Sequence, residues 1–90
     1  MIEIKFPVYV LAKDCGEVMR FASSNELTGH IEAIDVENDE YDAWDAIGRR
    51  INLVAHGVTA MKAGRIELVP MEDLIPAEVL EQLTWRATKR

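Results

Sequence analysis

The chain has 90 residues, of which 49% are hydrophobic and 29% are charged, and its formal net charge is −6. This balance predicts one globular domain, residues 1–90, and excludes a multidomain protein and a disordered chain. Nucleic acid and anionic membranes attract positive charge, so an acidic chain without a Lys/Arg cluster should bind neither. We expect a basic protein surface as partner, because complementary charge speeds encounter and fixes register.

The predicted subcellular location rests on features that the sequence lacks. A single cysteine, Cys15, cannot form an internal disulfide, so nothing points to an oxidising compartment. The N-terminus has no basic lead followed by a long apolar run, as a signal peptide would. No apolar run approaches the roughly 20 residues of a membrane span. We therefore expect a cytoplasmic protein.

The first elements form a predicted hairpin. Residues 3–13 are rich in β-branched and aromatic side chains and predict a strand, in which Pro7 suggests an edge position or a bulge. Residues 14–16 predict a turn. Residues 17–21 alternate polar and apolar side chains and predict the second strand.

A capping box, Ser23 with Glu26 three residues later, predicts a short helix. Alternation in residues 31–37 then predicts a strand with Ile34 and Val36 on one face. After a turn at Asn38-Asp39, we expect strands over residues 40–46 and 50–55, separated by a turn at Gly48.

The C-terminal part contains one ambiguous segment, residues 56–64, which fits either a loop or a continued strand. Residues 65–69 alternate and predict the last strand, which Pro70 should end. Pro76 should open a helix with an apolar stripe of Val79, Leu80, Leu83 and Ala87. The fold class is therefore α+β: an antiparallel sheet of about five or six strands, a short internal helix and a C-terminal helix.

Seven carboxylates and no basic residue lie between Glu32 and Asp45. Residues 31–48 carry a charge of −7, and the remaining ten basic and nine acidic residues sum to +1. The entire charge imbalance thus falls on one predicted acidic hairpin, residues 32–45. Like charges that face each other across a hairpin destabilise it.

Two interpretations of this stretch stay open. It is either a solvated face that keeps the protein soluble or a docking face for a basic partner, with Tyr41 and Trp44 as aromatic anchors. The alternative place for Trp44 is the core. The candidate partner-binding residues are Asp35, Glu37, Asp39, Glu40, Tyr41, Asp42, Trp44 and Asp45.

Enzymatic and metal-binding chemistry has little support. Asp35, Glu37 and Asp39 fit positions 1, 3 and 5 of a calcium loop, but Glu40 replaces the required glycine and Ala46 the bidentate glutamate. Cys15, His30 and His56 have no partner at catalytic or zinc spacing. No phosphate-binding or nucleophile-elbow motif occurs. We expect no catalytic residue, no metal and no cofactor.

The run from Ile34 to Asp45, Ile-Asp-Val-Glu-Asn-Asp-Glu-Tyr-Asp-Ala-Trp-Asp, resembles a motif of small uncharacterised bacterial proteins, to which no activity attaches. In size, acidity and α+β build the chain is also similar to bacterial immunity proteins, which cover the basic active sites of toxins with acidic surfaces. This second resemblance implies a non-enzymatic inhibitor.

Three classes of function remain at this point. The leading hypothesis is a protein-binding module that presents the acidic stretch to a basic partner. The second is a small ligand-binding protein or enzyme, with a pocket between the sheet and the C-terminal helix lined by Trp44, Tyr9 and the histidines. The third is a homodimer, assembled through an exposed strand edge or the region of Trp85.

Overall fold

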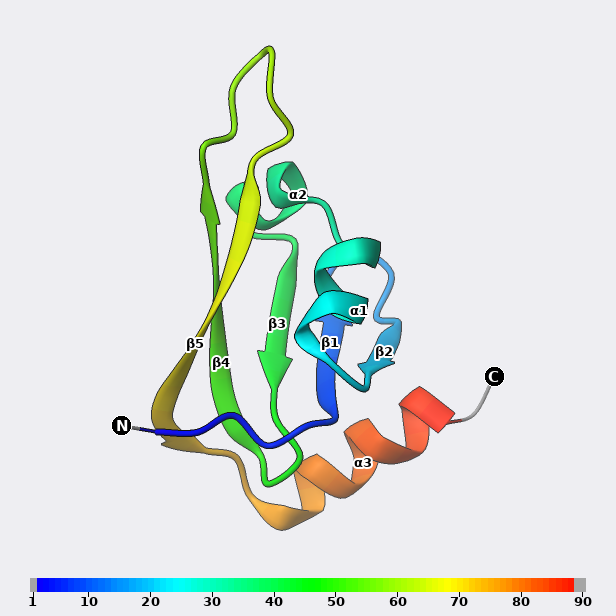
Figure 1. The fold of residues 1–90 in the computed structure, drawn as a ribbon. Coiled ribbons are helices and arrows are strands. Elements are labelled where there is room, and N and C mark those ends of the chain that lie inside the picture. The colour runs from blue at the N-terminus through cyan, green and yellow to red at the C-terminus, as the bar shows by residue number, and fades with distance from the viewer. Residues whose placement is uncertain (1, 89–90) are drawn as a thin grey trace.

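Five antiparallel strands form one sheet in the order β2-β1-β3-β4-β5 in the computed structural model, which describes residues 2–88 (Figure 1). The strands are β1 (Val8–Ala12), β2 (Val18–Phe21), β3 (Tyr41–Trp44), β4 (Arg49–His56) and β5 (Arg65–Leu74). The helices are α1 (Ser24–His30), α2 (Ala33–Glu37) and α3 (Ala77–Thr88). The predicted α+β class with an antiparallel sheet is confirmed.

The sheet has a hydrophobic core on each face, and β1 contributes to both. Val8 and Val10 pack in a cluster with Leu27 of α1 and Ile31. Tyr9, between them in the strand, packs in the other cluster with residues of α3. Successive side chains of a strand point to opposite faces, so α1 and α3 lie on opposite sides of the sheet. The fold has three layers.

The predicted hairpin and helix cap are both present. β1 pairs with β2 in a register that places Val8 opposite Phe21 and Leu11 opposite Val18. Ser23 is the N-cap of α1, and its hydroxyl accepts a hydrogen bond from the backbone N–H of Glu26 at 3.1 Å. This is half of a capping box, and it satisfies one of the backbone donors that a helix N-terminus leaves open.

The strand predicted for residues 31–37 is wrong, because this segment contains the helix α2. Ala33 is buried and Val36 packs against the core, whereas Ile34 is 49% exposed. The two apolar residues that contact the core, Ala33 and Val36, are thus three positions apart, which is helical spacing. The alternation of Ile34 and Val36 with acidic residues resembles the pattern of a strand, so the helical spacing was not recognised. The acidic stretch is therefore a helix, a turn and a strand, not a hairpin.

Pro7 does not mark an edge strand, because β1 lies between β2 and β3 in the sheet. The strand starts at Val8, one residue after the proline. Pro7 therefore stands outside the ladder, and its missing N–H removes no ladder hydrogen bond.

Pro70 does not end the last strand either, since β5 continues to Leu74. The backbone N–H of Asp45 donates to the carbonyl of Arg49, so Arg49 points its polar groups toward β3. Ile51, two residues further on, points the same way, and Pro70 lies opposite Ile51. Pro70 therefore points its nitrogen away from β4, at the outer edge of the sheet, where no donor is needed.

The ambiguous segment is a loop except for its first residue, His56, which ends β4. The loop, residues 57–64, joins β4 to β5 and projects beyond α2 (Figure 1). Gly64 fixes its return to the sheet. It has φ +77°, and a Cβ there would come within 2.6 Å of the carbonyl oxygen of His56. Any other residue would meet both the unfavourable backbone conformation and this contact.

The C-terminal helix follows Pro76 as predicted. Leu83 and Ala87 of its apolar stripe are buried, and Leu80 packs partly against them. Val79 is 42% exposed and lies at the margin of the stripe. The Arg86 guanidinium donates to the Gly16 carbonyl and thus ties the helix to the β1–β2 turn.

A buried carboxylate organises the end of the sheet opposite α2. Asp45 is 0% exposed. Its Oδ1 accepts hydrogen bonds from the backbone N–H groups of Ile47 at 3.1 Å and Arg49 at 2.9 Å, and its Oδ2 accepts one from Lys5 at 3.2 Å. One side chain thereby closes the β3–β4 turn and attaches the N-terminal segment to it.

We expect Asp45→Ala to lower the free energy of unfolding by about 3 kcal/mol, because three backbone donors would lose a charged acceptor. Asp45→Asn should cost less, since its single oxygen can still serve two donors in the turn. Urea unfolding of both variants measures the difference. A loss below about 1 kcal/mol for Asp45→Ala would contradict this role.

Candidate functional site

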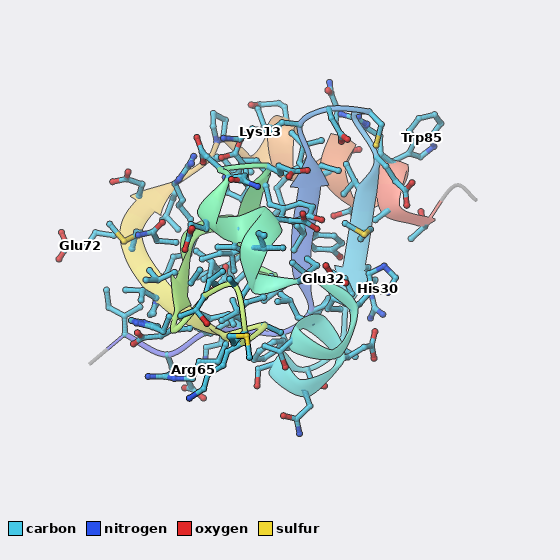
Figure 2. The ribbon with its side chains drawn as sticks, turned by 90° about the horizontal axis from the view of Figure 1, so that it is seen from above. Lys13, His30, Glu32, Arg65, Glu72 and Trp85 are labelled. Atoms are coloured by element: carbon cyan, nitrogen blue, oxygen red, sulfur yellow. The ribbon has the colours of Figure 1, made fainter. Side chains whose placement is uncertain are left out.

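Six carboxylates surround the end of the molecule that α2 occupies. We call these residues the acidic face: Asp14, Glu32, Asp35, Glu37, Asp39 and Glu40. Asp14 comes from the β1–β2 turn, the next three from α2 and its N-cap, and the last two from the turn into β3. Side chains from separate elements thus meet at one surface. Figure 2 shows Glu32 beside α2.

Tyr41 stands at the centre of the acidic face. It packs partly against the core of the α1 side. Burial raises the pKa of its phenol, and the carboxylates of Asp35, Glu40, Asp14 and Glu32 raise it further. Four negative charges thus act on one half-buried aromatic ring, and their field disfavours a fifth.

Glu40 shows the same repulsion. Desolvation raises the pKa of its carboxyl above the ordinary 4.5, and the charges of Asp35 and Asp14 add to the shift. A side-chain hydrogen bond with Asp35 acts in the same direction. The acidic face therefore contains carboxylates that fold together against their mutual repulsion.

Lys13 is the cation that faces these groups. Its ammonium nitrogen lies 3.0 Å from Asp39 and 3.7 Å from Asp42. The hydrogen bond to Asp39 is the largest cause that raises its pKa. Lys13 thus pairs with Asp39 of the acidic face and with Asp42 of β3. Within residues 2–88, none of the four carboxylates around Tyr41 forms an ion pair.

The last three predicted site residues lie inside the fold or in ion pairs. Asp42 bonds to the Arg50 guanidinium at 2.8 Å and its side chain is 22% exposed. Trp44 is 8% exposed and packs with Tyr9 in the core under α3. Asp45 is the buried carboxylate described above. The predicted set therefore divides into an outer part, Asp35 to Tyr41, and an inner part that supports the sheet.

The other reactive side chains are dispersed. Cys15 is exposed in the β1–β2 turn. His30 at the end of α1 packs against Phe21 with ring centroids 5.6 Å apart and ring planes tilted by 49°. His56 at the end of β4 pairs with Glu67 at 2.7 Å. Within residues 2–88, no three His, Cys, Asp or Glu side chains are arranged to hold a metal ion. The space between the sheet and α3 is filled by the core cluster that contains Tyr9 and Trp44.

An open groove of about 730 Å³ lies between the α1–α2 connection and the β4–β5 loop. Its walls combine apolar side chains such as Ile34 and Met61 with charged ones such as Glu32, Lys62 and Arg65. Figure 2 shows Glu32 near α2 and Arg65 near the start of β5. The acidic face thus borders a concave surface, which the sequence patterns did not indicate.

A second acidic run escaped the sequence analysis. Residues 66–85 contain five carboxylates and no Lys or Arg. The summed charge outside residues 31–48 is +1, because basic residues at other positions offset the five carboxylates of this run. A local charge count over each 20-residue window would have found it.

Comparison of the chain with models of protein families, with curated proteins and with solved structures finds no match. Within the described residues, no helix is both long and apolar enough to cross a membrane.

We expect Glu40→Gln to stabilise the protein at pH 7, because it removes a charge that Asp35 and Asp14 repel. A carboxyl with a raised pKa binds its proton more tightly in the folded state, so its contribution to stability is largest at low pH and decreases as the pH rises through the folded pKa. The gain should therefore vanish below about pH 4. Thermal unfolding at pH 3.5 and 7 measures it, and destabilisation at pH 7 would contradict the repulsion.

Proposed function

We propose that the protein is a cytoplasmic, non-enzymatic protein-binding module whose acidic face docks on a basic surface of a partner protein. The observation that carries the proposal is the group of four carboxylates around Tyr41, whose charges add to the rise that burial causes in the pKa of its phenol. A face that served only solubility could spread its charges apart. Here charges from three segments converge at a cost in electrostatic energy.

The aromatic ring adds a second reason. Tyr41 is half-buried at the centre of the acidic face, and tyrosine is enriched among the residues that contribute most to interface energy. Its surrounding carboxylates could pair with Lys or Arg of a partner, and that pairing would remove their mutual repulsion. Binding would therefore gain both Coulomb attraction and the release of stored repulsion.

In its concrete form, the proposal is an inhibitor of the immunity type, which would cover the basic active site of a toxin with the acidic face. A basic active site needs clustered Lys or Arg to hold an anionic substrate. A surface that presents several carboxylates around one aromatic ring could occupy the same cations. The proposal rests on this charge complementarity and on the build of the chain.

A ligand-binding protein is a second candidate, and the groove beside the acidic face favours it. The groove is large enough for a small molecule, since ligand pockets span about 300–1,000 Å³. Its charged groups, Glu32 on one wall and Lys62 and Arg65 on the other, would suit a ligand with both signs of charge. Calorimetric titration with zwitterionic peptides would test this candidate.

The docking proposal predicts that Asp35→Asn, Glu37→Gln and Asp39→Asn together abolish capture of basic partners at low salt. Capture by the unaltered protein should weaken between about 0.05 M and 0.5 M salt, because screening shortens the reach of surface charges. Affinity capture from the host lysate, followed by mass spectrometry, identifies the partners.

The matched control is Glu3→Gln, Glu26→Gln and Glu81→Gln, which removes the same charge from exposed positions outside the acidic face. It should retain the partners. Loss of the partners in both variants would mean that net charge alone matters, and retention in both would remove the proposed role.

A further inference from the structure

The strand β5 leaves one edge of the sheet open. It is the last strand in the order and pairs with β4 alone (Figure 1). Its pairing is regular from Arg65 to Pro70, so residues whose backbone faces β4 alternate with residues whose backbone faces outward. Ile66 and Leu68 face outward, because Pro70 does. Within residues 2–88, the outward N–H and C=O groups of these two residues form no hydrogen bond.

Unpaired backbone groups of this kind are a template for another strand, and proteins usually block them with proline, a bulge or a short strand. In β5 these blocks lie in the second half of the strand. Pro70 offers no N–H, and the pairing with β4 is irregular between Arg49 and Ile51. The other edge of the sheet, β2, has only four residues. Residues 65–69 of β5 are therefore the open part of the sheet edge.

Two kinds of side chain flank this open edge. Ile66 and Leu68 lie on the α1 side, where they are half-buried and line an open groove of about 460 Å³ together with Phe6. Arg65 and Glu67 alternate with them in the strand and are exposed, so they lie on the other face of the sheet. In the part of the chain that the structure describes, Arg65 forms no ion pair.

We propose that two copies of this chain join their sheets through the β5 edges, as antiparallel strands around a two-fold axis that passes between the two Ile66 residues. A two-fold axis repeats every contact, so both copies use the same surface. Arg65 of each copy then lies opposite Glu67 of the other, and the ion pair forms twice. The open edge of β5 contains no residue of the acidic face, so the inference stands independently of the proposed function.

Charge and hydrogen bonding favour this register over its neighbours. An axis at Arg65 or Glu67 would place like charges directly opposite each other, which is destabilising. An axis at Leu68 would place Ile66 opposite Pro70, which has no N–H, so each copy would lose one hydrogen bond. With the axis at Ile66, the two Ile66 residues exchange both of their backbone hydrogen bonds. Arg65 and Glu67 then form a non-hydrogen-bonded pair, in which side chains approach most closely.

The open edge is complementary to itself, which selects a second copy over a strand of another protein. Opposite charges stand two residues apart on one face, with the outward-facing Ile66 between them, and antiparallel two-fold pairing matches each charge to its opposite. Glu67 uses its Oε1 for the contact with His56 at 2.7 Å, which leaves its Oε2 for Arg65 of the second copy. The pairing occupies the open edge of both copies, so the assembly closes at two chains.

Sedimentation equilibrium of the full chain, from about 10 µM to about 1 mM, tests the inference. Few residues take part on each side, so we expect a weak dimer with a dissociation constant of about 0.1 mM. Arg65→Glu should raise that constant at least about tenfold, because a carboxylate would face Glu67 at both symmetric positions. Combining Arg65→Glu with Glu67→Arg should restore it, since opposite charges face each other again with their signs exchanged.

The matched control is Arg20→Glu, which makes the same charge change at an exposed residue of the β2 edge and should leave the constant unchanged. Amide hydrogen exchange of the unaltered protein locates the contact. The N–H of Ile66 should exchange more slowly as the protein concentration rises, because the second copy accepts its hydrogen bond. The N–H of Arg20 also faces outward, since the carbonyl of Glu17 accepts from Ala12 of β1. Its exchange rate should not change with concentration.

Three results would overturn the inference. A monomer at every concentration would leave the β5 edge to a strand of another protein. An unchanged constant for Arg65→Glu, or no recovery in the double variant, would show that Arg65 does not face Glu67 of the second copy. Concentration-dependent protection at Arg20 instead of Ile66 would assign the dimer to the β2 edge.

Discussion

The buried carboxylate of Asp45 determines where the two ends of the acidic stretch can lie. It accepts hydrogen bonds from the backbone of Lys5, Ile47 and Arg49, so the N-terminal segment, the β3–β4 turn and the start of β4 are held by one side chain. Asp45 fixes the last part of β3 at this end of the molecule. The first residue of β3, Tyr41, lies at the other end of the strand, next to α2. The carboxylates that precede Tyr41 must then gather at the opposite end of the molecule, because the strand separates them from Asp45 along the sheet.

The carboxylates of the acidic run from Glu32 to Asp45 therefore have two different roles. Asp42 and Asp45 stabilise the sheet through Arg50, Lys13 and backbone donors. The carboxylates around Tyr41 instead add to the rise that burial causes in the pKa of its phenol and in that of the Glu40 carboxyl. Proteins commonly give up stability where a surface has to act on something else. The division is therefore the physical basis of the docking proposal.

Local signals in the sequence predicted most of the fold. The capping box at Ser23, the alternation in β2 and the start of α3 after Pro76 each act within a few residues, so sequence alone reveals them. The errors arose where tertiary context decides. Ala33 and Val36 form a helical face only because α2 packs on the sheet, and Pro70 is tolerated only because β5 is an edge strand. For the site, the sequence located the carboxylates but could not show that Trp44 is buried in the core.

The salt dependence of stability measures whether the carboxylates of the acidic face fold together against net repulsion. Urea unfolding at pH 7 should be followed as KCl rises from about 0.01 M to about 0.2 M, which shortens the screening length from about 30 Å to below 10 Å. Because urea is uncharged, the measured change reflects screening alone. We predict that the free energy of unfolding increases with salt. A decrease would show instead that attractive ion pairs outweigh the repulsion among the carboxylates.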